Sequence, residues 1–172
     1  GANDPEHMNN TYLFYRAGSR GVTVEPDPEL INELMRRRPL DTNLHAGVGG
    51  IGKHTSKLYL MSAKTLNTFS ENEARAISEK GKHQLLGTVD VKILGIMEIV
   101  EKYFKSGELD FLSIDVEGLD QEILENIDFE VVRPVVICIE TLAYDERQGE
   151  GKRTPIIEYL SGKGYMIYAD TY

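Results

Sequence analysis

The sequence is poor in cysteine, tryptophan and long apolar runs, and these deficits exclude several classes of protein. Its only cysteine, Cys138, cannot form an internal disulfide and cannot by itself make a zinc site. No apolar stretch approaches the roughly 20 residues that span a bilayer, and no segment resembles a signal peptide. We therefore expect no membrane span, and a cytoplasmic location.

Basic residues are also scarce, since 19 Lys and Arg stand against 28 Asp and Glu, for a formal net charge of −9. Binding to phosphate groups needs clustered cations, so we expect no nucleic-acid partner. The one compact basic run, Arg36-Arg37-Arg38, falls at a predicted helix end, where cations interact favourably with the helix dipole. The length predicts about one domain with a real core.

From Gly21 onward, short apolar strands alternate with amphipathic helices. Asp27-Pro28 is a helix start, with a capping Asp and Pro at the first helical position, and Ser70 to Glu73 form a capping box. The alternation predicts an α/β fold with a mostly parallel sheet covered on both faces. The predicted strands are residues 21–25, 44–48, 57–62, 88–92, 111–114, 135–139 and 165–169; the predicted helices begin near residues 10, 28, 71, 96, 119 and 154; residues 143–153 are predicted to be a mobile surface loop.

Residues 109–118, with the sequence Leu-Asp-Phe-Leu-Ser-Ile-Asp-Val-Glu-Gly, are the first candidate for a functional site. An apolar strand ends there in Asp115 and Glu117, followed by Gly118 for a tight turn. Ligands of open α/β sheets bind beyond the carboxyl ends of the strands. Glu25 and Glu140 also follow predicted strands, so three acids are expected at one edge. Each could instead be a helix N-terminal charge worth under about 1 kcal/mol.

Several motifs occur together in a familiar order and spacing. They are Gly1-Ala2-Asn3-Asp4-Pro5, Asn10-Thr11-Tyr12, Val24-Glu25-Pro26-Asp27-Pro28, residues 111–118, and Arg133-Pro134 with Ile139-Glu140. With them, nearly all of the chain resembles the FkbM-type family of S-adenosylmethionine-dependent methyltransferases. The resemblance implies a class I methyltransferase fold, a Rossmann-like three-layer sandwich with a mostly parallel sheet.

The resemblance also implies which residues hold S-adenosylmethionine. Residues 1–3 correspond to the glycine loop under its methionine part, Glu25 to the acid that binds its ribose, and residues 47–48 to the flank of its adenine ring. Asp115 corresponds to the position beside the methyl group and the acceptor, and is the one catalytic candidate. The implied cofactor-binding residues are thus Gly1, Ala2, Asn3, Glu25, Pro26, Gly47, Val48 and Asp115.

Two strands of the family are missing from these 172 residues. The central strand precedes the Gly-Ala-Asn loop in the family, and a final antiparallel strand follows Tyr172. A sheet without its central strand would expose two long edges, which soluble proteins avoid. We therefore expect residues 1–172 to be a single methyltransferase domain truncated at its first and last strands, a fragment of a longer protein.

The expected reaction is O-methylation of a small-molecule or carbohydrate acceptor, a hydroxyl on a sugar, glycolipid or secondary metabolite. Asp115 would act as general base or would steer the acceptor hydroxyl. In a variant of this mechanism Asp115 and Glu140 share a divalent cation, but we assign no metal site. Glu117 could orient the turn after the strand at residues 111–114 rather than take part in catalysis. Of the histidines only His7, beside the glycine loop, could lie at the site.

Other interpretations stay open. The alternative function is a non-catalytic module with a degenerate methyltransferase fold that binds a nucleotide or a partner. A nicotinamide-dependent oxidoreductase fits less well, because the first loop is not G-x-G-x-x-G. Residues 144–153 are either part of an acceptor lid or an ordinary loop. The sequence identifies neither the acceptor nor the oligomeric state.

Overall fold

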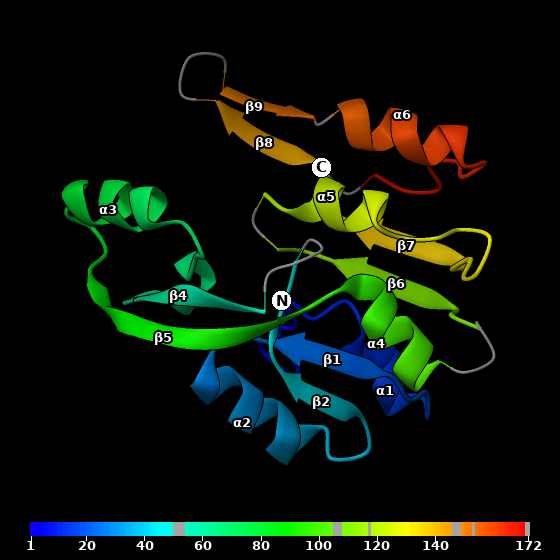
Figure 1. Cartoon of the computed structure of the whole chain (residues 1–172), viewed down its shortest axis with the longest axis horizontal. Coiled ribbons are helices and arrows are strands. Elements are labelled where there is room, and N and C mark those ends of the chain that lie inside the picture. The colour runs from blue at the N-terminus through cyan, green and yellow to red at the C-terminus, as the bar shows by residue number, and fades with distance from the viewer. Residues whose placement is uncertain (50–53, 105–107, 117, 146–148, 153, 171–172) are drawn as a thin grey trace.

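The computed structural model describes residues 1–49, 54–104, 108–116, 118–145, 149–152 and 154–170. Strands and helices alternate along most of the chain (Figure 1). The helices are α1 (Tyr12–Arg16), α2 (Pro28–Arg37), the 3₁₀ turn η1 (Lys64–Leu66), α3 (Glu71–Glu79), α4 (Ile96–Tyr103), α5 (Asp120–Glu125) and α6 (Thr154–Gly162). The strands are β1 (Val22–Glu25), β2 (Thr42–His45), β3 (Gly47–Val48), β4 (Thr55–Met61), β5 (Leu85–Leu94), β6 (Phe111–Ile114), β7 (Val136–Ile139), β8 (Leu142–Asp145) and β9 (Gly149–Lys152).

Two parallel strand pairs form the centre of the molecule. β1 pairs with β2, with Glu25 opposite His45, and β6 pairs with β7, with Ile114 opposite Ile139. Within the described ranges no ladder joins these pairs to one another. The protein is therefore a mixed α/β structure with small parallel sheets, as the alternation predicts, and a continuous three-layer sandwich is not confirmed.

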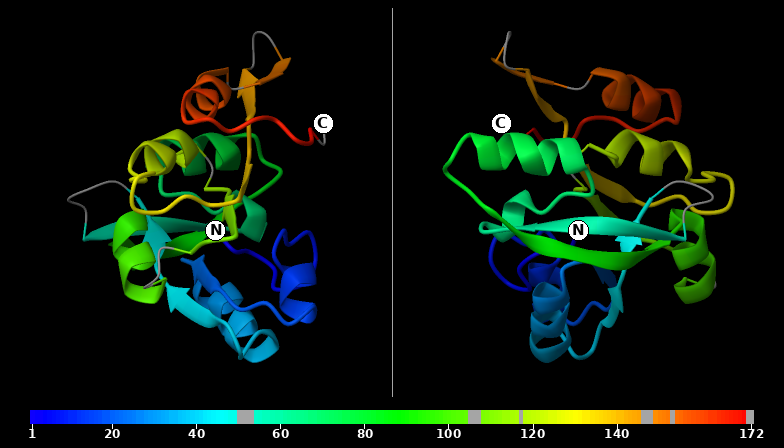
Figure 2. Two further views of the ribbon diagram at one scale, coloured as in Figure 1. Left: turned by 90° about the vertical axis from the view of Figure 1, so that its right-hand side faces the viewer. Right: turned by 60° about the vertical axis from the view of Figure 1, so that its left-hand side comes forward.

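The predicted strand over residues 44–48 is wrong in its bounds. The chain changes partner at the buried residue Ala46, so that β2 pairs with β1 while β3 pairs with β5. β5 is also twice the predicted length, because residues 85–92 form an antiparallel ladder with β4, with Tyr59 opposite Thr88. Figure 2 shows this two-stranded arm reaching away from the parallel pairs, with α3 beside it.

The predicted helix starts are confirmed at α2 and α3. Asp27 caps α2 by accepting hydrogen bonds from the backbone N–H groups of Glu29 and Leu30, at 2.7 and 3.1 Å. Ser70 caps α3 by accepting from the N–H of Glu73 at 3.3 Å. Such caps satisfy backbone donors that a helix start leaves without partners, which is why these polar residues fix where the helices begin.

The largest buried cluster packs three helices against β6. Ile96 and Val100 of α4, Ile114 of β6, Leu124 of α5 and Ile156 of α6 are each less than a tenth exposed. Burying an aliphatic side chain of this size contributes about 1.5–3 kcal/mol. The core thus holds β6 firmly, together with the turn at its carboxyl end.

Two predictions for the last third of the chain are wrong. Residues 143–153 are not a loop throughout, since β8 and β9 pair there as antiparallel strands, with Leu142 opposite Lys152. Local pairing between neighbouring strands satisfies backbone groups whatever the polarity of the side chains. Residues 165–169 form no strand, and their apolar Met166, Ile167 and Tyr168 are largely exposed. No described helix is long and apolar enough to cross a membrane.

Candidate active site at the carboxyl ends of β1 and β6

Glu25, the last residue of β1, is buried, and each of its carboxylate oxygens accepts one backbone hydrogen bond. Its side chain is only 4% exposed. Oε2 accepts a hydrogen bond from the N–H of Asn3 at 2.7 Å, and Oε1 accepts from the N–H of Asp27 at 2.9 Å. The carboxylate therefore ties the first loop of the chain to the start of α2.

Residues 1–3 bridge the carboxyl ends of the two parallel pairs. The N–H of Ala2 donates to the carbonyl of Val24 at 2.9 Å, and the nitrogen of Gly1 donates to the carbonyl of Asp115 at 2.6 Å. A Cβ at Gly1 would stand only 3.3 Å from Oε2 of Glu25. The predicted glycine loop, Glu25 and Asp115 are thus brought together, and Gly1 lets the backbone pass between the two acids.

Side chains of residues 4–9 hold the loop in shape. Asn9 donates through Nδ2 to the carbonyls of Ala2 and Asp4, at 2.9 and 2.8 Å. The Asp4 carboxylate accepts from the backbone N–H groups of Glu6 and His7. These backbone donors stabilise the charged carboxylate, so the pKa of Asp4 is lowered from its ordinary value. His7 itself is 87% exposed at its side chain, so burial does not fix its position.

Arg38 supports the loop from beneath, and the sequence analysis missed this role. Its guanidinium donates to Oδ1 of Asn9 and to Oγ1 of Thr11, and forms a 2.6 Å salt bridge with Asp41. The side chains of Arg38 and Asp41 are 3% and 1% exposed. A signal was present, because Arg38 follows Leu34 by four residues and so continues the buried stripe of α2.

Asp115 follows β6 and is exposed, at the edge of the loop. The turn after it is shaped by Asp120, which is fully buried and accepts from the N–H groups of Val116 and Gly118, each at 3.1 Å. Gly118 has a φ of +99°, a value that favours glycine, so the predicted tight turn is confirmed. Asp120 was not anticipated. Glu117 lies outside the described residues.

Cys138 lies on β7 opposite Ser113 of β6, close to the candidate site. Burial raises the pKa of its thiol, the negative charge of Asp115 raises it further, and a hydrogen bond with Ser113 opposes the rise. Ser113 also accepts a 3.1 Å hydrogen bond from Nδ2 of Asn10. The carboxyl end of β6 is thereby linked to both the first loop and β7.

The remaining predicted cofactor residues are Pro26, which directly follows Glu25, and Gly47 and Val48 of β3. Gly47 is buried in β3, where a Cβ would stand 2.8 Å from Phe69 and Ile93, so packing accounts for the glycine. Val48 is half-buried and lines a large cavity described below. The carbonyl of Pro26 lies 3.1 Å from Nε2 of His45. Gly47 and Val48, the proposed adenine flank, also pair with Ile93 and Leu94 of β5.

A cavity of about 940 Å³ opens between β1 and β6. Gly1, Ala2, Asn3 and Asp115 line its end at the carboxyl edge. Other lining residues belong to β1, β6, α1 and α4. Glu25, Pro26 and Gly47 are not among the lining residues.

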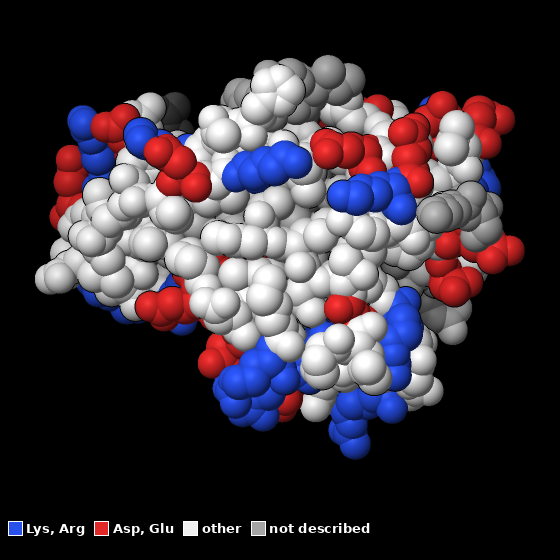
Figure 3. Space-filling model, turned by 60° about the horizontal axis from the view of Figure 1, so that its bottom comes forward, with Lys and Arg blue, Asp and Glu red and all other residues white. Residues whose placement is uncertain are grey.

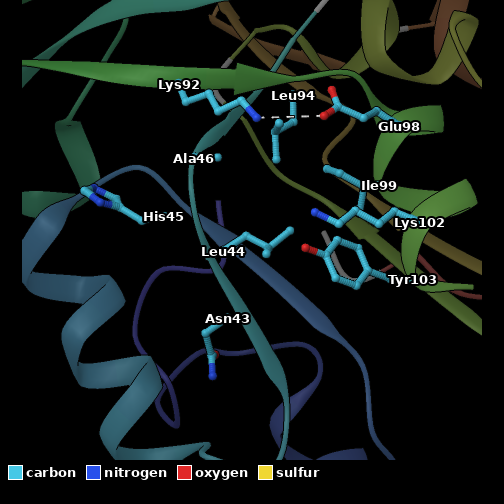
Figure 4. A pocket seen from close by; sticks show the side chains of 10 residues that line it. All are labelled: Asn43, Leu44, His45, Ala46, Lys92, Leu94, Glu98, Ile99, Lys102 and Tyr103. Carbon is cyan, nitrogen blue, oxygen red and sulfur yellow. Dashed lines mark ion pairs between the residues drawn. The ribbon is translucent and has the colours of Figure 1, made fainter.

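A second, smaller cavity of about 240 Å³ lies on the other side of α4 (Figure 4). Leu44 and Ala46 of the β2–β3 segment and Leu94 form its apolar wall. Lys92 and Glu98 lie 3.9 Å apart at its rim, and both are more than half exposed. Ile99 and Tyr103 line both cavities, so α4 is the wall between them.

Charge on the outer surface is mixed. Figure 3 shows a band without charged side chains across one face of the molecule, with Lys and Arg gathered below it and both Lys or Arg and Asp or Glu above it. Within the described ranges no three His, Cys, Asp or Glu side chains are grouped closely enough to hold a metal ion.

The sequence was compared with protein families, with curated proteins and with solved structures. The family model described as the methyltransferase FkbM domain matches residues 1–167. The search of curated proteins and the search of solved structures found no match. The match covers the loop at residues 1–3, the parallel pairs β1–β2 and β6–β7, and the turn after β6.

Proposed function

Because the chain belongs to the FkbM methyltransferase family, we propose that it transfers a methyl group from S-adenosylmethionine to a hydroxyl group of a sugar, a glycolipid or a secondary metabolite. The observation that carries this proposal is the convergence of residues 1–3, Glu25 and Asp115 at one edge. No described contact favours the non-catalytic alternative.

The residues at this edge fit the proposed cofactor. Each oxygen of Glu25 accepts one backbone hydrogen bond, and a carboxylate oxygen can accept two, so the group keeps capacity for the hydroxyls of a ribose. Its backbone donors hold it in one orientation before any ligand arrives. When bound, S-adenosylmethionine supplies a methyl group on a cationic sulfur, and the two acids give the edge a negative charge that suits a cation.

Asp115 is the residue that we propose acts on the acceptor. Its side chain is exposed at the mouth of the cavity, while its carbonyl is fixed by the nitrogen of Gly1. The Asp120-supported turn holds the residues that follow. In the proposed reaction the Asp115 carboxylate accepts the hydroxyl proton as the oxygen–methyl bond forms and the sulfur–methyl bond breaks. General bases of this kind typically contribute about 10²–10⁴-fold to the rate.

The test is a methyl-transfer assay with tritium-labelled S-adenosylmethionine and a panel of hydroxylated sugars, glycolipids and small metabolites. With any acceptor that is turned over, Asp115→Asn should reduce kcat by about a hundred-fold or more. Asp90→Asn, an exposed acid of β5 paired with Lys57, is the matched control and should leave kcat unchanged. Equal turnover by Asp115→Asn and the unaltered chain would rule out the assigned role.

A further inference from the structure

The smaller cavity beside α4, which we call the α4 pocket, is separate from the candidate active site. Its lining comes from the β2–β3 segment, from the end of β5 and from α4 (Figure 4). Its lining residues include none of residues 1–3, Glu25 or Asp115. A ligand in this pocket would therefore be distinct from the cofactor that we assign to the edge.

The floor of the α4 pocket is apolar and well packed. Ala46, Leu94 and Ile99 are between 2% and 8% exposed and form one buried cluster, and Leu44 and Tyr103 pack against it. The backbone of Ala46 is also fixed, because its N–H donates to the carbonyl of Glu25 at 3.3 Å. Pockets that bind small molecules combine a preformed apolar lining of this kind with a few polar groups.

Two lysines supply the polar groups of the α4 pocket. Lys92 comes from β5 and Lys102 from α4. Figure 4 shows the ammonium group of Lys102 directed from α4 toward the β2–β3 segment. This ammonium lies 5.1 Å from the centre of the Tyr103 ring, and no carboxylate of the described residues forms an ion pair with it. Lys102 is therefore available to an anion in the pocket.

The charges around the α4 pocket favour an anion as well. Glu98 is the one acid among the lining residues, and its carboxylate lies 3.9 Å from Nζ of Lys92, beyond hydrogen-bond distance. His45 makes its contact with the carbonyl of Pro26, and its ring points away from the pocket in Figure 4. Two cations thus stand against one acid, in a chain whose formal net charge is −9.

The volume of the α4 pocket limits the size of the ligand. A dry apolar cavity of about 150 Å³ is enough to hold a benzene ring. The α4 pocket has about 240 Å³, which leaves room for one ring and a small charged group. It is smaller than the roughly 300–1,000 Å³ of sites that take drug-sized ligands.

We propose that the α4 pocket binds a small aromatic carboxylate. The ring packs on the floor formed by Ala46, Leu94 and Ile99, and the carboxylate accepts hydrogen bonds from the ammonium groups of Lys92 and Lys102. This site goes beyond the proposed function and does not depend on it.

The first test is a titration of the isotope-labelled chain with benzoate, followed by NMR. Benzoate should shift the amide and methyl signals of Leu44, Ala46 and Leu94 in a saturable way. Benzamide keeps the ring without the charge and acetate keeps the charge without the ring, so each should bind at least about tenfold more weakly. Equal affinity for benzamide, the absence of saturable shifts, or shifts confined to Leu112 and Ser113 of the larger cavity would overturn the proposal.

The second test removes the charges and keeps the packing. The double variant Lys92→Met and Lys102→Met should weaken benzoate binding by at least about tenfold and leave the affinity for benzamide unchanged. Lys82→Met, at an exposed lysine away from the pocket, is the matched control and should bind benzoate normally. Equal benzoate affinity in the double variant and in Lys82→Met would contradict the role of the two lysines. Neither test uses the methyl donor, so a failure here is distinguishable from a failure of the proposed function.

Discussion

The backbone N–H of Asn3 donates a 2.7 Å hydrogen bond to Oε2 of Glu25, across a separation of 22 residues. The same carboxylate accepts the N–H of Asp27, which caps α2. One buried acid therefore sets both the place of the first loop and the start of a helix. The candidate site is preorganised by this acid before any ligand binds.

Removing the carboxylate of Glu25 should destabilise the fold. Glu25→Ala removes the acceptor of the part-buried N–H of Asn3 and of the buried N–H of Asp27, so the free energy of unfolding should fall by about 1–3 kcal/mol. Urea denaturation measures the loss, and Glu79→Gln, an exposed acid of α3, is the control. An unchanged midpoint in Glu25→Ala would show that the loop is not held through this carboxylate.

Substitution of Arg38 should destabilise the fold much more than substitution of its neighbour Arg37. Arg38→Met leaves Asp41 as a buried charge without its partner and should cost about 3–5 kcal/mol. Arg37→Met removes only an exposed ion pair with Glu6 and should cost at most about 1 kcal/mol. Denaturant unfolding of the two variants side by side tests this, and equal losses would contradict the support given by Arg38 to the loop.

Gly118 should tolerate no side chain without strain. At a φ of +99°, Gly118→Ala should lower the free energy of unfolding by about 1–2 kcal/mol. Gly87→Ala in β5, where a Cβ meets nothing within 4 Å, should be neutral or stabilising. The comparison by thermal or denaturant unfolding separates backbone strain from the general effect of adding a methyl group. If Gly118→Ala were as stable as Gly87→Ala, the turn would not need glycine.

The thiol of Cys138 should titrate above its ordinary range, because burial raises its pKa. Alkylation by iodoacetamide should therefore be slow near pH 8 and speed up only at higher pH. Asp115→Asn removes a neighbouring negative charge that raises the pKa, so the pH profile of alkylation should move to lower pH. Ser113→Ala removes a hydrogen bond that lowers the pKa, so the profile should move to higher pH. Identical profiles in all three proteins would place Asp115 away from Cys138.

Local signals in the sequence were enough for much of the fold. Asp27 and Ser70 begin the helices they were expected to cap, and the apolar runs before Asp115 and Glu140 are the paired strands β6 and β7. These features depend on neighbouring residues alone. The change of partner at Ala46 and the length of β5 depend on ladders between distant segments, which a local pattern does not encode.

In the candidate site, too, some features could be predicted from local motifs and others could not. The motifs predicted that residues 1–3, Glu25 and Asp115 would share an edge, and the hydrogen bonds place them there. Arg38 and Asp120 were missed because their roles come from burial, and each looks like an ordinary charged residue of a helix. The assignment of Gly47 to the cofactor stays a prediction, and close packing against Phe69 and Ile93 is a second reason for a residue without a side chain there.

The most direct test of this account is calorimetric titration of S-adenosylmethionine and of its demethylated product into the folded chain. The account predicts binding that weakens at least about tenfold in Glu25→Ala, corresponding to 1.4 kcal/mol, and is unchanged in Glu79→Gln. Folding of each variant is checked by circular dichroism beforehand. Absence of binding to the folded chain, or equal affinity in Glu25→Ala, would contradict the assignment of the cofactor to this edge.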